Sequence, residues 1–348
     1  MLEQKFEDQT VQFRYLRTTE LLKAEVNLTL PNLSRVYFFG AKEADVFVET
    51  MRRRNVVVRL GGPNNNYLRR ASELRNRTVI EIAGVALPDR MLETGEQVAE
   101  VIENLAILAT TLVMRRNELH RKLGIVKSAT GEINLAVTSG FKRIRLRSQR
   151  APSLEGILID KSFCNRFSKC GLIQLFQYLQ STGDLTKRVR TSANWLLESR
   201  RESRLNAAVV KTAIALESLL VFSESESLAR TLSERSAFIL SNSPDVRRII
   251  SAIILRFYDV RSGVVHGSQK KAKKLTPSLI ECVDRLTLIL HLIIASNTDV
   301  WPSVESLRLW CELQRWDKPF SNLKFPLSRK YLNNALDLAA AEISSTVS

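Results

Sequence analysis

The stretch Leu255-Arg-Phe-Tyr-Asp-Val-Arg-Ser-Gly-Val-Val-His-Gly267 contains an arginine and a histidine, Arg261 and His266, with four residues between them. Arginine can hold phosphate oxygens with two parallel donors, and histidine exchanges protons near neutral pH. The spacing alone is weak evidence, because all three histidines of the chain meet it loosely, in the pairs Arg115 and His120, Arg261 and His266, and Arg285 and His291. The surrounding sequence therefore has to distinguish them.

Helical pattern dominates the sequence around this stretch. From Leu185 onward, apolar residues recur at three-four spacing and strand-like alternation disappears. Pro244 and Pro277 suit first-turn positions, each preceded by a potential cap, Ser243 and Thr276. The pattern predicts helices at about 185–202, 205–222, 227–241, 244–260, 277–296 and 328–343.

Three runs in this helical region, in this order, resemble those of Apea-type HEPN domains. They are Ala215-Leu-Glu-Ser-Leu-Leu220, Leu232-Ser-Glu-Arg-Ser-Ala-Phe-Ile-Leu240 and Tyr258-Asp-Val-Arg-Ser-Gly-Val-Val-His-Gly267. The resemblance covers roughly residues 185 to 296 and implies a HEPN-type helical bundle. Nuclease members of that family cut RNA, in some cases in anti-phage defence, and need no metal or other cofactor.

The resemblance implies that Arg261 and His266 are the catalytic pair, with polar Ser262 beside the arginine. RNA cleavage by 2′-hydroxyl attack needs a base, an acid and stabilisation of the phosphate charge. We therefore expect His266 to act as general acid or base and Arg261 to anchor the phosphate. In the family such pairs meet across a dimer, which implies a homodimer or a HEPN contact within a larger assembly.

Helix geometry leaves an alternative open. Positions five apart on an ideal helix are about 140° apart around its axis. A distortion at Gly263 would bring Arg261 and His266 closer together. Without such a distortion, the two are ordinary polar residues at a helix end.

Other polar residues have competing interpretations. Glu217 lies on a nearly apolar helix and needs a partner, for which Arg235 is the candidate; a structural ion pair is favoured over a catalytic role. His291, between leucines, is interpreted as a hydrogen-bonded core histidine and His120 as a surface residue. A basic cluster after His266 predicts either attraction of an RNA backbone or a solvated loop; it comprises Lys270, Lys271, Lys273 and Lys274.

The first half of the chain mixes strand-like and helix-like segments and resembles no family. Strands are predicted at 35–39, 55–59, 78–83, 133–137 and 141–146, and one long helix at 96–119. The fold class is therefore α+β. We expect a mixed α/β domain at 1–180 that senses, binds or regulates, a HEPN-like helical domain at 181–300, and a helical extension at 301–348.

Composition limits the partners and the compartment. The formal net charge is +16, from 52 Lys and Arg against 36 Asp and Glu, which favours nucleic acid over an anionic membrane surface. The four cysteines form no CxxC pair and no zinc set, which fits a reducing cytoplasm and predicts no metal. No apolar stretch is long enough to span a bilayer.

The leading hypothesis is a metal-independent endoribonuclease acting on RNA in the cytoplasm. The alternatives are a non-catalytic HEPN binding or scaffold module, and a subunit of a larger nucleic-acid complex. The sequence contains no P-loop, dinucleotide-type glycine fingerprint, HExxH motif or nucleophile elbow.

Overall fold

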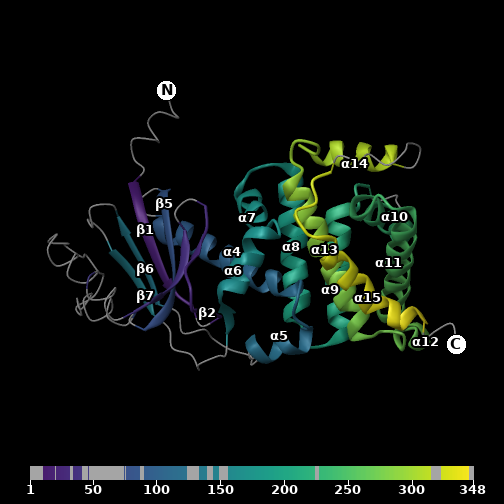
Figure 1. The fold of residues 1–348 in the computed structure, drawn as a ribbon, viewed down its shortest axis with the longest axis horizontal. Helices are drawn as coiled ribbons and strands as arrows, with labels where there is room; N and C mark the ends of the chain where they lie inside the picture. Colours follow the sequence, from purple (N-terminus) through teal and green to yellow (C-terminus); the bar gives the residue numbers. More distant parts are fainter. Residues whose placement is uncertain are drawn as a thin grey trace. The chain divides into compact units, whose positions relative to one another are not determined.

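The computed structural model describes residues 11–19, 21–31, 34–40, 46, 74, 76–86, 90–123, 133–138, 144–148, 156–223, 227–314 and 323–344. The chain forms two compact units, drawn as ribbons in Figure 1. One comprises residues 1–106 and 121–165, and the other residues 107–120 and 166–348. The first contains a small, mainly antiparallel sheet and the second is helical, so the α+β class is confirmed.

The first unit is built on a six-stranded antiparallel sheet with the order β3-β4-β5-β1-β6-β7. A separate parallel pair joins β2 (Leu22–Ala24) to β8 (Ile157–Ile159). The strands of the larger sheet are β1 (Val11–Thr18), β3 (Leu28–Thr29), β4 (Arg35–Phe39), β5 (Arg77–Ala86), β6 (Ile133–Thr138) and β7 (Ile144–Ser148).

Helix α4 (Met91–Thr111) packs against strand β1 of this sheet. A Cβ atom at Gly95 would collide with the ring of Tyr15, so the glycine permits the close approach. Further along the helix, Glu103 forms a buried ion pair with Arg17, at 3.0 Å between Oε2 and Nη2. A carboxylate and a guanidinium buried together satisfy each other and fix the helix on the strand.

The predicted strands agree with the sheet where the structure describes them. The strand at 35–39 is β4, 78–83 lies within β5, 133–137 lies within β6, and 141–146 overlaps β7. The strand expected at 55–59 falls outside the described residues, as do residues 141–143 of the strand expected at 141–146. The single helix expected at 96–119 is wrong, because α4 ends at Thr111 and a new helix, α5 (Arg116–Leu123), begins at Arg116.

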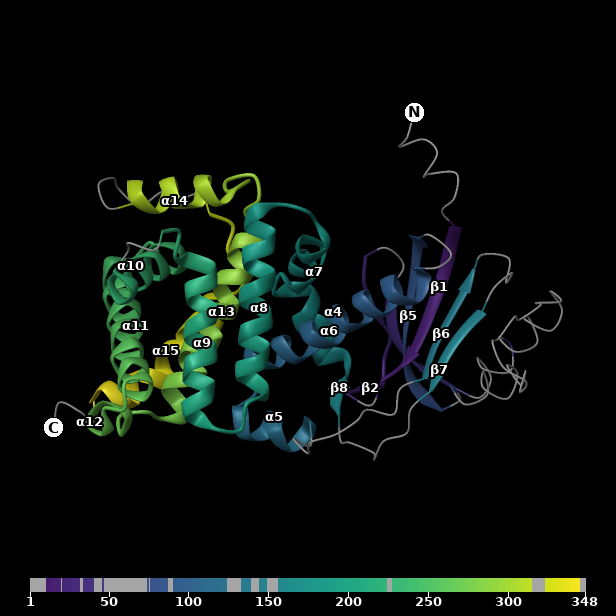
Figure 2. The same cartoon turned by 180° about the vertical axis from the view of Figure 1, so that it is seen from behind.

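The second unit is organised around α13 (Pro277–Ser296), which is buried along nearly its whole length. It packs against six of the other helices, and Figure 2 shows the arrangement from behind. The remaining helices are α6 (Lys161–Lys169), which begins in the first unit, α7 (Leu172–Gln180), α8 (Asp184–Arg201), α9 (Leu205–Leu220), α10 (Leu228–Leu240), α11 (Pro244–Val265), α12 (Gln269–Ala272), α14 (Val304–Leu313) and α15 (Arg329–Ser344).

The six helices predicted from periodicity are present. The predicted ends of α13 match its observed ends, whereas α11 continues five residues beyond its predicted end at 260. Thr276 caps α13, because its hydroxyl accepts a hydrogen bond from the Leu279 amide at 3.2 Å. Ser243 is the N-cap residue of α11, as predicted, but its side chain makes no capping hydrogen bond. No helix in the described ranges is long and apolar enough to cross a membrane.

Candidate functional site

The candidate site lies at the C-terminal end of α11. His266 is the residue that caps this helix, and its amide donates to the Ser262 carbonyl at 2.9 Å. Gly267 follows in the left-handed region with φ of 73°, a conformation that glycine adopts without a steric cost. The amide of Ser268 then donates to the Gly263 carbonyl at 2.8 Å, and the chain turns into α12.

Gly263 does not distort α11, which remains helical through Val265. It instead allows α12 to pack against α11, because a Cβ at this position would collide with the Cβ of Lys271. Arg261 and His266 therefore remain about 140° apart around the helix axis. The expectation that a distortion brings them onto one face is wrong.

Arg261 is held by an acidic partner on α9. Its Nη2 lies 3.3 Å from Oε1 of Glu217, and both side chains are 22% exposed. The hydroxyl of Tyr258 lies 3.1 Å from the same carboxylate oxygen and 3.2 Å from the Ala213 carbonyl. Burial, and then the nearby Glu217 carboxylate, raise the pKa of the Tyr258 phenol, so it stays protonated and donates.

Glu217 thus has a partner other than the expected Arg235. The guanidinium of Arg235 points to the end of α9, where Nη1 donates to the Leu220 carbonyl at 2.5 Å. Its central carbon also lies 4.3 Å from the centre of the Phe222 ring. Arg235 is buried and contacts the last turn of the helix, whereas Arg261 comes from the helix that faces Glu217.

His266 is exposed, and no hydrogen bond involves its imidazole within the described part of the chain. Within the described residues, the one hydrogen bond between Ser262 and His266 runs from the His266 amide to the Ser262 carbonyl. The arginine is therefore fixed by the fold and the histidine is free to meet another molecule.

The four lysines of the basic cluster are exposed, but they differ in whether they form an ion pair. Lys271 pairs with Asp259 of α11, with 2.6 Å between Nζ and Oδ1, and this pair ties α12 to α11. Lys270, Lys273 and Lys274 are exposed, and no ion pair involves them among the residues the structure describes. These three lysines remain available to a polyanion.

His291 is a core histidine, as expected. It is fully buried on α13, and its Nε2 lies 2.7 Å from the Ser192 hydroxyl of α8. Burial lowers the pKa of His291 to about 3, so the imidazole is neutral throughout the physiological range.

This burial predicts a pH-dependent loss of stability. In the unfolded chain His291 takes up a proton near pH 6.5, whereas the folded protein takes it up only near pH 3. The unfolded state therefore binds more protons in this window, and stability falls as the pH falls, by about 1.4 kcal/mol per pH unit. Urea unfolding from pH 7 to pH 4.5 should show a shallower loss for His291→Gln than for wild type. His266→Gln, at an exposed position, is the matched control and should follow wild type.

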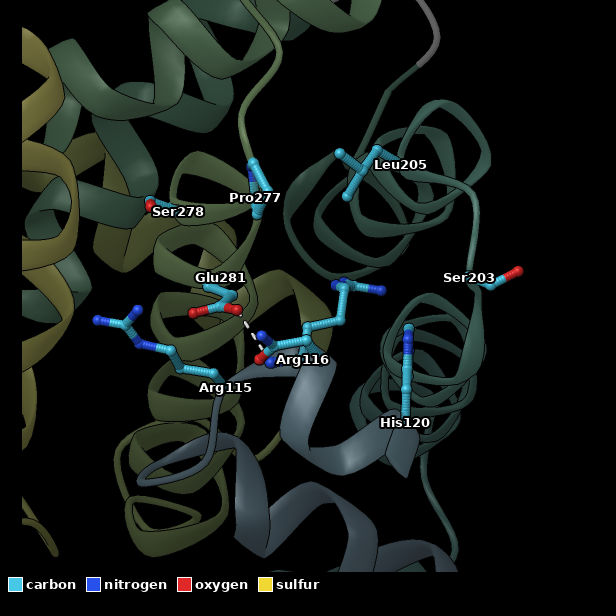
Figure 3. A pocket seen from close by; sticks show the side chains of 9 residues that line it. Arg115, Arg116, His120, Ser203, Leu205, Pro277, Ser278 and Glu281 are labelled. Carbon is cyan, nitrogen blue, oxygen red and sulfur yellow. Dashed lines mark hydrogen bonds between the residues drawn. The ribbon is translucent and has the colours of Figure 1, made fainter. Parts of the chain in front are cut away.

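His120 is not the surface residue that was expected. It is half-buried in the second turn of α5, and its Nε2 lies 2.8 Å from the Arg200 carbonyl. Burial, and to a lesser degree Arg116 and Arg200, lower its pKa. It lines a pocket with Arg115, Arg116 and Glu281, shown in Figure 3.

Sequence reasoning also missed a buried charged network beside this pocket. The carboxylate of Asp284 accepts from Nη2 of Arg116 at 2.6 Å and from the Thr212 hydroxyl at 2.8 Å. Arg200 lies 3.8 Å from the same carboxylate. The signal in the sequence is that Glu281, Asp284 and Arg285 interrupt an otherwise apolar helix.

No protein-family model matches this chain, and no curated protein or solved structure is significantly similar to it. Within the described residues, no group of three or more His, Cys, Asp and Glu side chains is arranged to hold a metal ion.

Proposed function

We propose that the protein is a metal-independent endoribonuclease and that its helical unit is a HEPN-type domain. The observation that carries the proposal is the end of α11, where the exposed imidazole of His266, with no partner among the described residues, follows an arginine that Glu217 holds in place. The lysines of α12 and the turn after it, and the net charge of +16, favour a polyanionic substrate.

The reaction needs only proton transfer and charge stabilisation. The 2′-oxygen of the RNA attacks the adjacent phosphorus and loses its proton to a base, which forms a 2′,3′-cyclic phosphate. The bond from phosphorus to the 5′-oxygen breaks, and that oxygen takes a proton from an acid. His266 serves as one of these proton carriers, and Arg261 holds the phosphate oxygens.

The test is an assay of purified full-length protein with total RNA in EDTA, with the new ends mapped. We expect 5′-hydroxyl ends, because the 5′-oxygen leaves protonated. Absence of cleavage by a folded, dimeric protein would favour the binding-module alternative.

The separation of Arg261 and His266 around the axis of α11 predicts a dimer. One copy presents Arg261 toward α9 and His266 on another side of the helix, and it supplies a single histidine where cleavage asks for an acid and a base. Two copies related by a two-fold axis would place two of each residue around one phosphate. Sedimentation at micromolar concentration should report about twice the 39.5 kDa of the chain. A strictly monomeric protein that still cuts RNA would rule out the shared cleft.

A further inference from the structure

A second site is visible in the helical unit, apart from the end of α11. A pocket of about 380 Å³ opens between the start of α5, the junction of α8 and α9, and the start of α13. Figure 3 shows Glu281 and Pro277 on one side, His120 and Leu205 on the other, and Arg116 between them. Cavities that hold small organic ligands measure roughly 300 to 1,000 Å³, so this one has the size for a single nucleotide.

The pocket and the network behind it carry more positive than negative charge. Three buried arginines, Arg116, Arg200 and Arg285, and the exposed Arg115 lie here, and two carboxylates among the described residues, Glu281 and Asp284, face them. The nearby Glu202 carboxylate is already paired with Lys211, 3.0 Å away. Among the buried groups this leaves three cations against two carboxylates, and Arg115 adds a solvent-exposed cation, so the pocket favours an anion.

The titration of the buried arginines reflects their burial. Burial lowers the pKa of Arg200 to about 10, a shift that Asp284 opposes and neighbouring Arg116 reinforces. Burial also lowers the pKa of Arg285; Glu281 opposes this shift, and the Arg115 guanidinium reinforces it.

The lining divides into donors, acceptors and an apolar wall. Arg115 is exposed, and no ion pair involves its guanidinium among the described residues. Nε2 of His120 faces a carbonyl, which only accepts, so Nε2 carries the proton and Nδ1 is left as an acceptor. Leu205 and Pro277 supply apolar surface. Glu281 is fixed at the start of α5, because its Oε1 accepts from the Arg116 amide at 2.9 Å.

We propose that this pocket binds a nucleoside 5′-phosphate. In Figure 3 the Arg115 side chain extends past Glu281, away from Leu205. Because it is exposed, it can turn to offer paired donors to the phosphate, while Leu205 and Pro277 offer contact to the sugar or base. The nucleotide has two possible sources, a free mononucleotide and the 5′-phosphorylated end of an RNA chain. The site is independent of Arg261 and His266, so its failure would leave the ribonuclease proposal standing.

The first test is calorimetric titration of the full chain with adenosine 5′-monophosphate, adenosine and inorganic phosphate. We expect the monophosphate to bind more tightly than either fragment. Arg115→Gln should weaken its binding about tenfold, because a charged pair of donors is lost. Arg204→Gln removes the same charge from an exposed residue just before α9 that does not line the pocket, and should leave binding unchanged.

The second test uses the sign of a charge change. Glu281→Gln keeps an acceptor for the Arg116 amide but removes a negative charge, so the monophosphate should bind about fivefold more tightly. A purely structural role for Glu281 predicts unchanged or weaker binding. The proposal is overturned if the monophosphate binds no better than adenosine or phosphate, or if both arginine variants weaken it equally.

The source of the nucleotide is settled by a third titration, with tetraadenylate carrying either a 5′-phosphate or a 5′-hydroxyl. Binding of the phosphorylated oligonucleotide that depends on Arg115, and is tighter than that of the monophosphate, assigns the site to an RNA end. Tighter binding of the free monophosphate assigns it to a small-molecule ligand.

Discussion

Replacing Asp284 by alanine should destabilise the protein by about 3 to 5 kcal/mol. Asp284 is fully buried, and its carboxylate is the counter-charge for Arg116 at 2.6 Å and for Arg200 at 3.8 Å. Both guanidiniums are themselves buried, so the variant leaves two cations in the core of the helical unit without a carboxylate between them. Whole-domain stabilities are commonly about 5 to 15 kcal/mol, so the loss is a large fraction.

Two further variants separate charge from packing. Asp284→Asn keeps the volume and an acceptor for the Thr212 hydroxyl, so a loss of stability here reports the missing charge alone. Asp245→Ala removes a carboxylate that is 81% exposed and pairs with Arg248 on the surface, and it should cost less than about 1 kcal/mol. Urea unfolding of the three variants gives the comparison. An Asp284→Asn protein as stable as wild type would show that the carboxylate does not neutralise the arginines.

The helices of the second unit were predictable because local patterns determine them. Three-four spacing, the prolines at first-turn positions and the Thr276 cap all act within a few residues of chain. The end of α11 was harder to predict because of Gly263. Its missing side chain lets α12 pack against α11 and does not bend α11. A glycine in a helix has both uses, and sequence alone does not distinguish them.

The features that the sequence did not predict depend on contacts between residues far apart in the chain. Apolar spacing continues from α4 past Thr111, but the helix ends there. Arg116, at the start of the next helix, pairs with Asp284, 168 residues away in the sequence. His120 is drawn into the same region by a carbonyl of α8. The partner of Glu217 likewise depended on which of two helices faces it. Periodicity reports that a face is buried, whereas the identity of the opposing side chain is set by tertiary packing.

Replacing His266 by alanine should reduce RNA cleavage by about 10²- to 10⁴-fold, the usual contribution of a positioned proton carrier. The side chain is exposed at the end of α11, so the melting temperature should not change. His120→Ala tests the other candidate histidine, since Arg115 and His120 have the same spacing as Arg261 and His266. If His120→Ala alone abolishes cleavage, the catalytic histidine is the one in the pocket and the assignment to α11 is wrong.

Mixing subunits then tests whether the two copies share one cleft. Arg261→Ala should be inactive yet folded, because the Arg261–Glu217 pair is partly exposed and adds little stability. When it is co-expressed with an equal amount of wild type, only about a quarter of the dimers contain two intact chains. A shared cleft therefore predicts about a quarter of wild-type activity, because mixed dimers lack one phosphate anchor, whereas independent sites predict about half. Activity that follows the fraction of wild-type chains would show that each copy carries a complete site. Arg261 and His266 of one chain would then have to come together on one side of α11 when RNA binds.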